Sequence, residues 1–299
     1  MRPRKHYAVT TALSANLCRM WALRIGRLAL ILALHATSGW AGVSPATVEL
    51  TFDGSFTGKC QLVGPDGTVR GGTSQAASFS LVNRQPLPAK DWYWDWGIQA
   101  ENYFFDGSPA TPKRVQDYAG IFSVEYFRGG EKAAALTLRP GWYFEGPATM
   151  AAWDAVVDLA IGFPVAGPVN GVVGFSNGRF YHHALPIAGL IWNINPHTRL
   201  ELVYPEPALV VTMGTSTSLR LGGELTGTGF LANSRPERTA AEYVSYRAGA
   251  EATKEMAPGV RLTLGAGVEI KRNFDFFAQD RLFHGSGARY ASVSVIISR

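Results

Sequence analysis

Apolar and polar residues alternate along most of the chain after residue 42. The pattern is clearest where Trp92, Trp94 and Trp96 occupy every second position and Tyr93 and Asp95 lie between them. Successive side chains of a β-strand point to opposite faces, so this spacing predicts a strand with one apolar and one polar face.

The same period of two recurs through the rest of the chain, and no helical period of 3.6 residues lasts longer than a turn or two. Short turn signals such as "GPDG" and "RGGE" separate the alternating runs. We expect about 12 strands of about ten residues, with 10 or 14 as alternatives. The segmentation is uncertain around "VYPEPALVV", because Pro205 and Pro207 either end a strand or bend it. The other segments with this alternation are 134–145, 153–163, 217–227, 242–252, 260–271 and 289–298.

Two all-β architectures use such strands. A soluble sandwich would bury the apolar face in its core, whereas a membrane barrel would turn it to lipid around a polar lumen. Strands of ten residues match the length that crosses a bilayer at a tilt, and aromatic residues near strand ends are typical of interfacial girdles. We therefore predict a single-domain antiparallel transmembrane β-barrel and keep the sandwich as the alternative.

This fold assigns a face to each charged residue and each tryptophan of the strands. The residues predicted to face the lumen are Asp95, Glu101, Arg139, Glu145, Asp154, Asp158, Arg220, Glu224, Arg247, Glu251, Arg261, Glu269 and Lys271. The aromatic residues predicted at the lipid interface are Trp92, Trp94, Trp96, Trp142, Trp153 and Trp192.

The first 41 residues resemble a secretory signal peptide. They contain six basic and no acidic residues, then the apolar run "LALILALHA", and then small residues at Gly39 and Ala41. Met20 fits as the true start, because the segment that begins there is a well-proportioned signal. The predicted organisation is therefore a signal peptide over 1–41 and an outer-membrane barrel domain over 42–299.

Removal of the signal changes the charge and the cysteine count. The signal takes six of the 28 basic residues and none of the 23 acidic ones, so 22 basic and 23 acidic residues remain. The precursor pI of about 9.2 is therefore no argument for nucleic-acid binding. Cys60 is left without a partner for an intramolecular disulfide, and a zinc site built on cysteines is excluded.

The middle and C-terminal parts of the chain resemble an uncharacterised family of bacterial outer-membrane β-barrels that carries a domain of unknown function. The resemblance lies in 185–211, 241–252 and 259–276. It implies a barrel in the outer membrane and no known ligand or activity. The chain departs from common outer-membrane strands at Arg299, because such strands end in an aromatic residue that the barrel-assembly machinery recognises.

One motif suggests chemistry. "GFSNG" (174–178) fits the G-x-S-x-G nucleophile elbow with Ser176 as nucleophile, and His182 and His183 follow it. The elbow requires a helix after the turn, but the sequence that follows predicts a strand, and Asn–Gly is a preferred hairpin pair. We therefore favour a hairpin. Ser176, a histidine and Glu206 remain the set that an outer-membrane lipid hydrolase would use.

These observations lead to three hypotheses. The first is a narrow outer-membrane channel or transporter for small or amphiphilic solutes, because 12 to 14 strands lie between filled small barrels and wide porins. The second is the lipid hydrolase, and the third is a barrel that transports nothing and serves as a scaffold. The expected partners are outer-membrane lipids, the barrel-assembly machinery and an unknown solute. We expect no nucleic acid, no cofactor and no metal.

Overall fold

The computed structural model describes residues 47–299, apart from 68, 107–110, 129–130 and 234–237. The predicted signal peptide and Met20 lie outside the described residues. In the described part, two short 3₁₀ helices accompany the strands, η1 (Met150–Ala152) and η2 (Phe277–Gln279). No helix there is long and apolar enough to cross a membrane.

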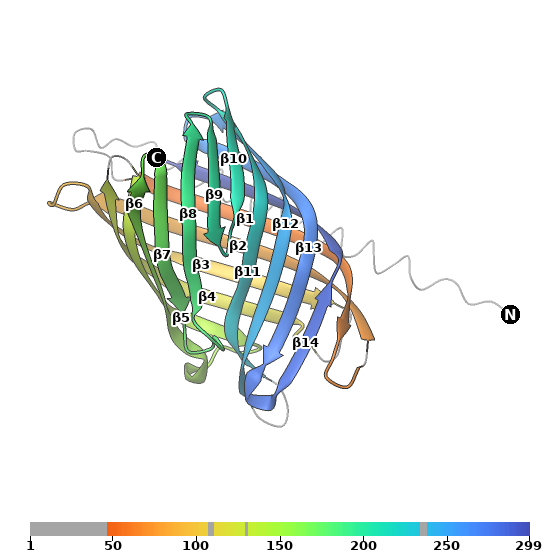
Figure 1. The fold of residues 1–299 in the computed structure, drawn as a ribbon. Helices are drawn as coiled ribbons and strands as arrows, with labels where there is room; N and C mark the ends of the chain where they lie inside the picture. Colours follow the sequence, from red (N-terminus) through yellow and green to blue (C-terminus); the bar gives the residue numbers. More distant parts are fainter. Residues whose placement is uncertain (1–46, 68, 107–110, 129–130, 234–237) are drawn as a thin grey trace. The chain divides into compact units, whose positions relative to one another are not determined.

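The described residues form fifteen strand segments in one antiparallel sheet (Figure 1). They are β1 (Thr47–Val63), β2 (Val69–Pro86), β3 (Trp92–Asp106), β4 (Arg114–Arg128), β5 (Glu131–Glu145), β6 (Trp153–Ala166), β7 (Val169–Asn177), β8 (Leu185–Asn195), β9 (Thr198–Tyr204), β10 (Ala208–Met213), β11 (Thr217–Ala232), β12 (Thr239–Ala257), β13 (Val260–Phe276), β14 (Arg281–Ser286) and β15 (Ala288–Ser298).

The sheet closes into a ring, because β1 pairs with the last strands of the chain. β14 and β15 share one place in the ring, since each pairs with β13 on one side and β1 on the other, and Gly287 separates them. The described strands therefore occupy fourteen positions. The predicted all-β antiparallel barrel is confirmed. Its expected count of twelve strands is corrected to the alternative of fourteen.

The difference in strand count arises partly at the two prolines of "VYPEPALVV". Residues 205–207 form a tight turn, and β9 and β10 pair as a hairpin of seven and six residues on either side of it. Proline is favoured in turns because its φ is fixed and it lacks a backbone donor. The segment is thus two short strands, not one bent strand.

The two ends of the barrel differ in the length of their connections. One end, here called the turn end, carries the C-terminus and short turns such as 167–168, 196–197 and 258–259. The opposite end, called the loop end, carries longer connections such as 178–184. Bacterial outer-membrane barrels have short periplasmic turns and longer extracellular loops, so the loop end is the extracellular one in such a membrane.

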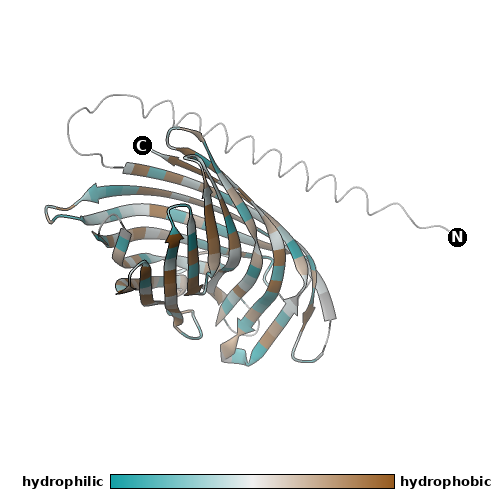
Figure 2. Ribbon diagram, turned by 45° about the horizontal axis from the view of Figure 1, so that its top comes forward, coloured by the Kyte–Doolittle hydropathy of each residue, from teal (hydrophilic) through white to brown (hydrophobic). Residues whose placement is uncertain are grey.

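Ring contacts across the barrel show which face points inward. The rings of Tyr103 on β3 and Tyr243 on β12 have centroids 5.3 Å apart, although these strands are far apart around the ring. The face of β3 that carries Tyr103 is therefore interior. The opposite face carries Trp94, Trp96 and Ile98, which are 39%, 44% and 55% exposed. Figure 2 shows the alternation of hydrophobic and hydrophilic residues along the strands.

An apolar exterior around a polar interior is the arrangement of a transmembrane barrel. The outward residues of β13 are apolar from Val260 to Ile270, and Leu264 is 56% exposed. Leaving such a continuous surface in water would be costly, because burying apolar area yields about 25 cal/mol per Å². The chain is therefore a membrane barrel of the outer-membrane type.

Candidate functional site

Charged side chains of four consecutive strands meet inside the turn half of the barrel. Arg84 on β2 contacts Asp95 on β3, with Nε 3.0 Å from Oδ1, and Glu125 on β4, with Nη2 2.6 Å from Oε2. Lys132 on β5 forms an ion pair with the same glutamate. Asp95 and Glu125 are only 4% and 5% exposed. The cluster fixes both signs of charge on the interior wall.

The other residues predicted for the lumen have partners on other strands, on the same strand or in a loop. Arg139 pairs with Asp158 at 2.9 Å, and Arg220 with Glu251 at 3.6 Å. The remaining contacts are Tyr103 Oη to Glu101 at 2.9 Å, Asn233 N to Glu145 at 3.0 Å, Arg179 N to Asp154 at 2.7 Å, and Arg261 to Glu49 at 3.4 Å. Glu224 lies on the interior face of β11 opposite Arg247 of β12.

A second charged layer is fully buried nearer the loop end. The Arg272 Nη2 atom lies 2.8 Å from Glu269 Oε2, and the two side chains are 1% and 0% exposed. Ser245 donates to Glu269 at 2.5 Å, and Arg272 donates to Ser74 Oγ on β2 at 2.9 Å. Arg247 reaches Thr57 on β1 at 3.3 Å. These contacts tie β12 and β13 to β1 and β2 through the interior.

Lys271 departs from the predicted alternation. The register between β12 and β13 shifts between Tyr246 and Arg247, which face Lys271 and Glu269. This bulge adds one residue to β13, so Arg272 takes the interior position and is 1% exposed. Lys271 is exposed on the outer face, and its prediction as a lumen residue is corrected for this reason.

Aromatic side chains fill the interior at the loop end. Phe105 packs edge-on against Tyr243 and Phe274, with centroid distances of 4.8 Å to each. Tyr103 and Phe230 belong to the same buried cluster, which also includes Cys60, Leu62, Val115, Tyr143, Phe276 and Phe283. The interior of the loop half is thus packed with aromatic and apolar side chains, in contrast to the charged turn half.

The barrel wall is interrupted between β8 and β11. β10 pairs with β11 only as far as Gly222, and β9 pairs with β8 only from Ala188. The second half of β11 therefore continues toward the loop end without β10 beside it (Figure 1). There Leu231 pairs in parallel with Phe144 of β5. This contact reduces the ring to nine described strands at the loop end, from β11 through β13, β14 and β1 to β5.

The β7–β8 loop, residues 178–184, fills this interruption and is here called the seam loop. Its first residues lie against β6, where Arg179 N donates to Asp154. Phe180 is 2% exposed, and its backbone packs against Gly229 of β11. A Cβ added to Gly229 would lie 2.6 Å from the carbonyl carbon of Phe180. Only a glycine fits there. Burial raises the pKa of the Tyr181 phenol, which the Arg139 guanidinium partly offsets.

The far end of the seam loop is fastened by its histidines. His182 Nδ1 lies 3.1 Å from Asp275 Oδ2 of β13, and its ring stacks on Phe277 at 4.9 Å. The His183 ring stacks on that of His182 at 4.1 Å. The loop thus spans from β6 past β11 to β13.

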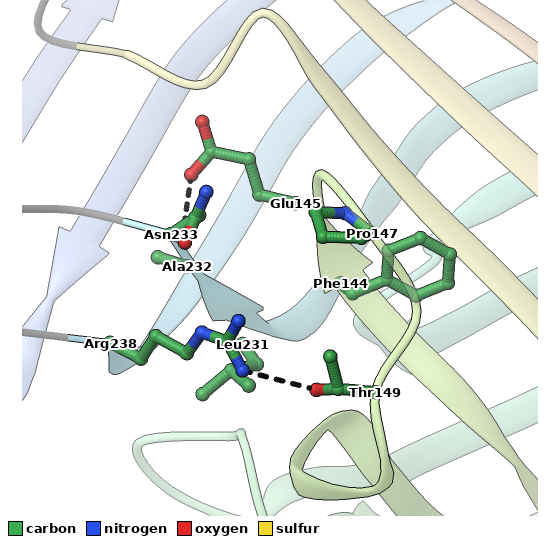
Figure 3. Close-up of a pocket in the computed structure, with 8 residues that line it drawn as sticks. All are labelled: Phe144, Glu145, Pro147, Thr149, Leu231, Ala232, Asn233 and Arg238. Atoms are coloured by element: carbon green, nitrogen blue, oxygen red, sulfur yellow. Dashed lines mark hydrogen bonds between the residues drawn. The ribbon is translucent and has the colours of Figure 1, made fainter.

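Polar contacts beside the seam loop hold β5 and β11 together. Figure 3 shows a small pocket with Glu145 accepting from Asn233 N, and Arg238 donating to Thr149 Oγ1 at 3.4 Å. Phe144 and Leu231 line the same pocket. These contacts join the end of β5 and the connection after it to the connection that follows β11. They therefore reinforce the parallel pairing of Leu231 with Phe144.

The residues named for hydrolysis are not brought together. Ser176 is on the interior face of β7, opposite Asp158 of β6 in the register. No hydrogen bond joins it to a histidine in the part of the chain that the structure describes. His182 is engaged with Asp275, and Glu206 lies in the turn between β9 and β10.

The six tryptophans predicted at the lipid interface lie on the outer face. Their exposed fractions fall between 39% and 45% in the barrel alone. Trp92, Trp94 and Trp192 are near the turn end, whereas Trp142 and Trp153 face each other in the register near the loop end. The two levels are separated by outward aliphatic side chains such as Leu138 and Ile161.

Sequence reasoning missed the interior aromatic core and several charged residues. Tyr103 and Phe105 occupy the same alternating face of β3 as Asp95, so the period of two could have placed them in the interior. Arg84 and Glu125 also follow the period of two on their strands, but their partners come from other strands, and Arg272 is interior only because of the bulge in β13. Their pairing therefore depends on register, which the sequence did not supply.

No family model and no curated protein matches the chain, so the resemblance to an uncharacterised family stays a prediction. Among solved structures, the chain is similar to an outer membrane channel from Pseudomonas putida F1, with 12% identity, 88% of this chain and 99% of that chain covered, and a TM-score of 0.49. It is similar to a deltaS2 mutant of the monoaromatic hydrocarbon channel TodX, at 8% identity, 85% and 91% coverage and a TM-score of 0.40. It is also similar to OprB from Pseudomonas putida, at 9% identity, 85% and 93% coverage and a TM-score of 0.36. We infer nothing about function from likenesses at this level.

Proposed function

We propose that the chain is an outer-membrane channel for small or amphiphilic solutes, held closed at its extracellular end. The observation that carries the proposal is the interruption of the wall between β8 and β11, which a single loop of seven residues fills. A scaffold barrel has no need of such an interruption. In a channel that opens, such an interruption provides a gate, because a loop is easier to displace than a paired strand.

The interior supports the choice of solute. Charged pairs such as Arg84–Asp95 line the turn half, and aromatic side chains such as Phe105 line the loop half. A molecule that passes both regions needs a polar and an apolar part. A ring of fourteen strands is wider than the eight that side chains fill and narrower than the 16–18 of porins, which favours small solutes.

Planar-bilayer recording tests the proposal directly. The purified, folded barrel is expected to show rare, brief conductance steps, because the closed arrangement dominates. Flux into vesicles should be faster for a small aromatic acid than for a neutral sugar of similar mass. Steady silence together with no flux, from protein shown to be folded by heat-modifiable migration, would contradict a channel.

Expected partners remain proposals as well. The outer aromatic and aliphatic surface is suited to membrane lipid, and the final strand β15 is the one that assembly machinery would engage in an outer-membrane barrel.

A further inference from the structure

The apolar outer surface is interrupted on three adjacent strands of the loop half. The interruption follows Phe56 on β1, Ile270 on β13 and Ala291 on β15, and outward apolar side chains recur beyond it at Val63 on β1 and Leu282 on β14. The next outward positions toward the loop end hold the three cations Lys59, Lys271 and Arg289, here called the outer cation cluster. Each belongs to a different strand, so the cluster exists only in the folded barrel.

Bulges and alternation place all three cations on the outer face. Thr57 and Cys60 both face the interior and are buried, because the register of β1 shifts between them. Lys59 therefore points outward and is exposed. Ala288 and Tyr290 are buried inside, so Arg289 between them points outward. Lys271 points outward because of the bulge in β13.

The strand register brings the three cations close together. Pairs Thr57↔Tyr290 and Gln61↔Ser286 set Lys59 beside position 288. Pairs Glu269↔Ala288 and Arg272↔Gly285 set Lys271 beside position 286. With strands about 4.8 Å apart and a rise of about 3.4 Å per residue, the three Cα atoms lie within roughly 12 Å of one another. Their long side chains can meet around one ligand.

The cluster has no acidic partner in the described structure. Ion pairs engage the interior cations Arg84, Arg139 and Arg272, but none engages a member of the cluster. Asp275, farther along the outer face of β13, is held by His182. Three unpaired cations in close proximity repel one another, so an anion that joins them is favoured.

We propose that Lys59, Lys271 and Arg289 bind the phosphate groups of a lipid in the extracellular leaflet. The cations interrupt the apolar surface of the loop half, and cations beside a bilayer attract anionic lipid headgroups. The acyl chains would lie on the outward residues of β13 and β15, including Leu264 and Val293, which are 56% and 43% exposed. The proposal rests on the barrel being in a membrane and not on transport.

Lipid binding to the purified full-length protein in detergent tests the proposal, with diphosphorylated lipid A as the probe. Binding is expected for the parent protein and to weaken about tenfold or more in the triple variant K59Q/K271Q/R289Q, because each cation near a headgroup contributes to binding. The matched control K90Q/K254Q/R299Q removes the same two lysines and one arginine from exposed positions toward the turn end and should bind as the parent does.

Two further measurements separate the sources of phosphate. Dephosphorylated lipid A should bind the parent as weakly as the triple variant binds the intact lipid. Inorganic phosphate at equal concentration should not displace the lipid. Equal binding by the test and control variants, or displacement by free phosphate, would overturn the proposal. Should the triple variant fail to show heat-modifiable migration, the single variant R289Q provides the test, with severalfold weaker binding expected.

Discussion

Phe180 is the residue whose removal tests the closed seam most sharply. It is 2% exposed, although it belongs to a loop, and its backbone lies against Gly229 of β11. Replacing a buried phenylalanine by alanine costs about 3–5 kcal/mol. If that energy holds the seam loop in place, and about 1.4 kcal/mol corresponds to a tenfold change, then Phe180→Ala should lower the closed-to-open ratio roughly a hundredfold or more.

The assay is the open probability of single barrels in a planar bilayer at fixed voltage. Gly229→Ala provides an independent perturbation, because its Cβ would lie 2.6 Å from the Phe180 carbonyl carbon and push the loop outward. Gly71→Ala is the control, since its nearest neighbour would be at 3.9 Å, an ordinary contact. Both seam variants should open more often, and the control should not.

The outcome that refutes this reasoning is specific. If Phe180→Ala and Gly229→Ala are folded and keep the open probability of the parent, the seam loop does not gate the barrel. The unfolding free energy in urea separates the two effects of Phe180→Ala. A large loss of stability with an unchanged open probability would make Phe180 a structural residue only.

Three other predictions follow from the interior and the outer surface. Arg272→Met should destabilise the barrel by about 3–5 kcal/mol in urea unfolding, because Glu269 is then buried without its partner, and the double variant with Glu269→Gln should recover most of that loss. Arg84→Gln leaves Asp95 without its cation and Glu125 with Lys132 alone, so the reversal potential in a salt gradient should shift toward cation selectivity; a shift toward anions would contradict the assigned interior face. Leu264→Arg places a charge in the apolar outer surface and should cost about 2–4 kcal/mol in lipid vesicles, whereas a cost near zero would mean that this face does not contact lipid.

The fold class was predictable because its signal is local. The period of two at Trp92, Trp94 and Trp96 sets the outer face of β3, and Asp95 between them lies inside, paired with Arg84. The strand count was less accessible, since the turn at 205–207 divides a segment that reads equally well as one bent strand.

The candidate site was largely beyond the sequence, because it depends on contacts across the ring. Tyr103 and Tyr243 are far apart in the chain, and only closure of the barrel brings their rings together. Around the seam loop the sequence analysis favoured a hairpin and named Ser176 and the two histidines as candidates for chemistry, yet Phe180 is the residue that is buried there. Lys271 was misplaced because a bulge is invisible to strict alternation.

The pairing of β1 with β14 and β15 has a consequence for how the barrel is made. The first strand keeps an open edge until residues 281–298 arrive, since those are its partners on that side. Joining positions about 240 residues apart costs on the order of 5 kcal/mol of chain entropy, and until then the edge can pair with another chain. Biogenesis therefore has a single late closing step, and a truncated product that lacks β15 should accumulate as aggregates and not as a smaller barrel.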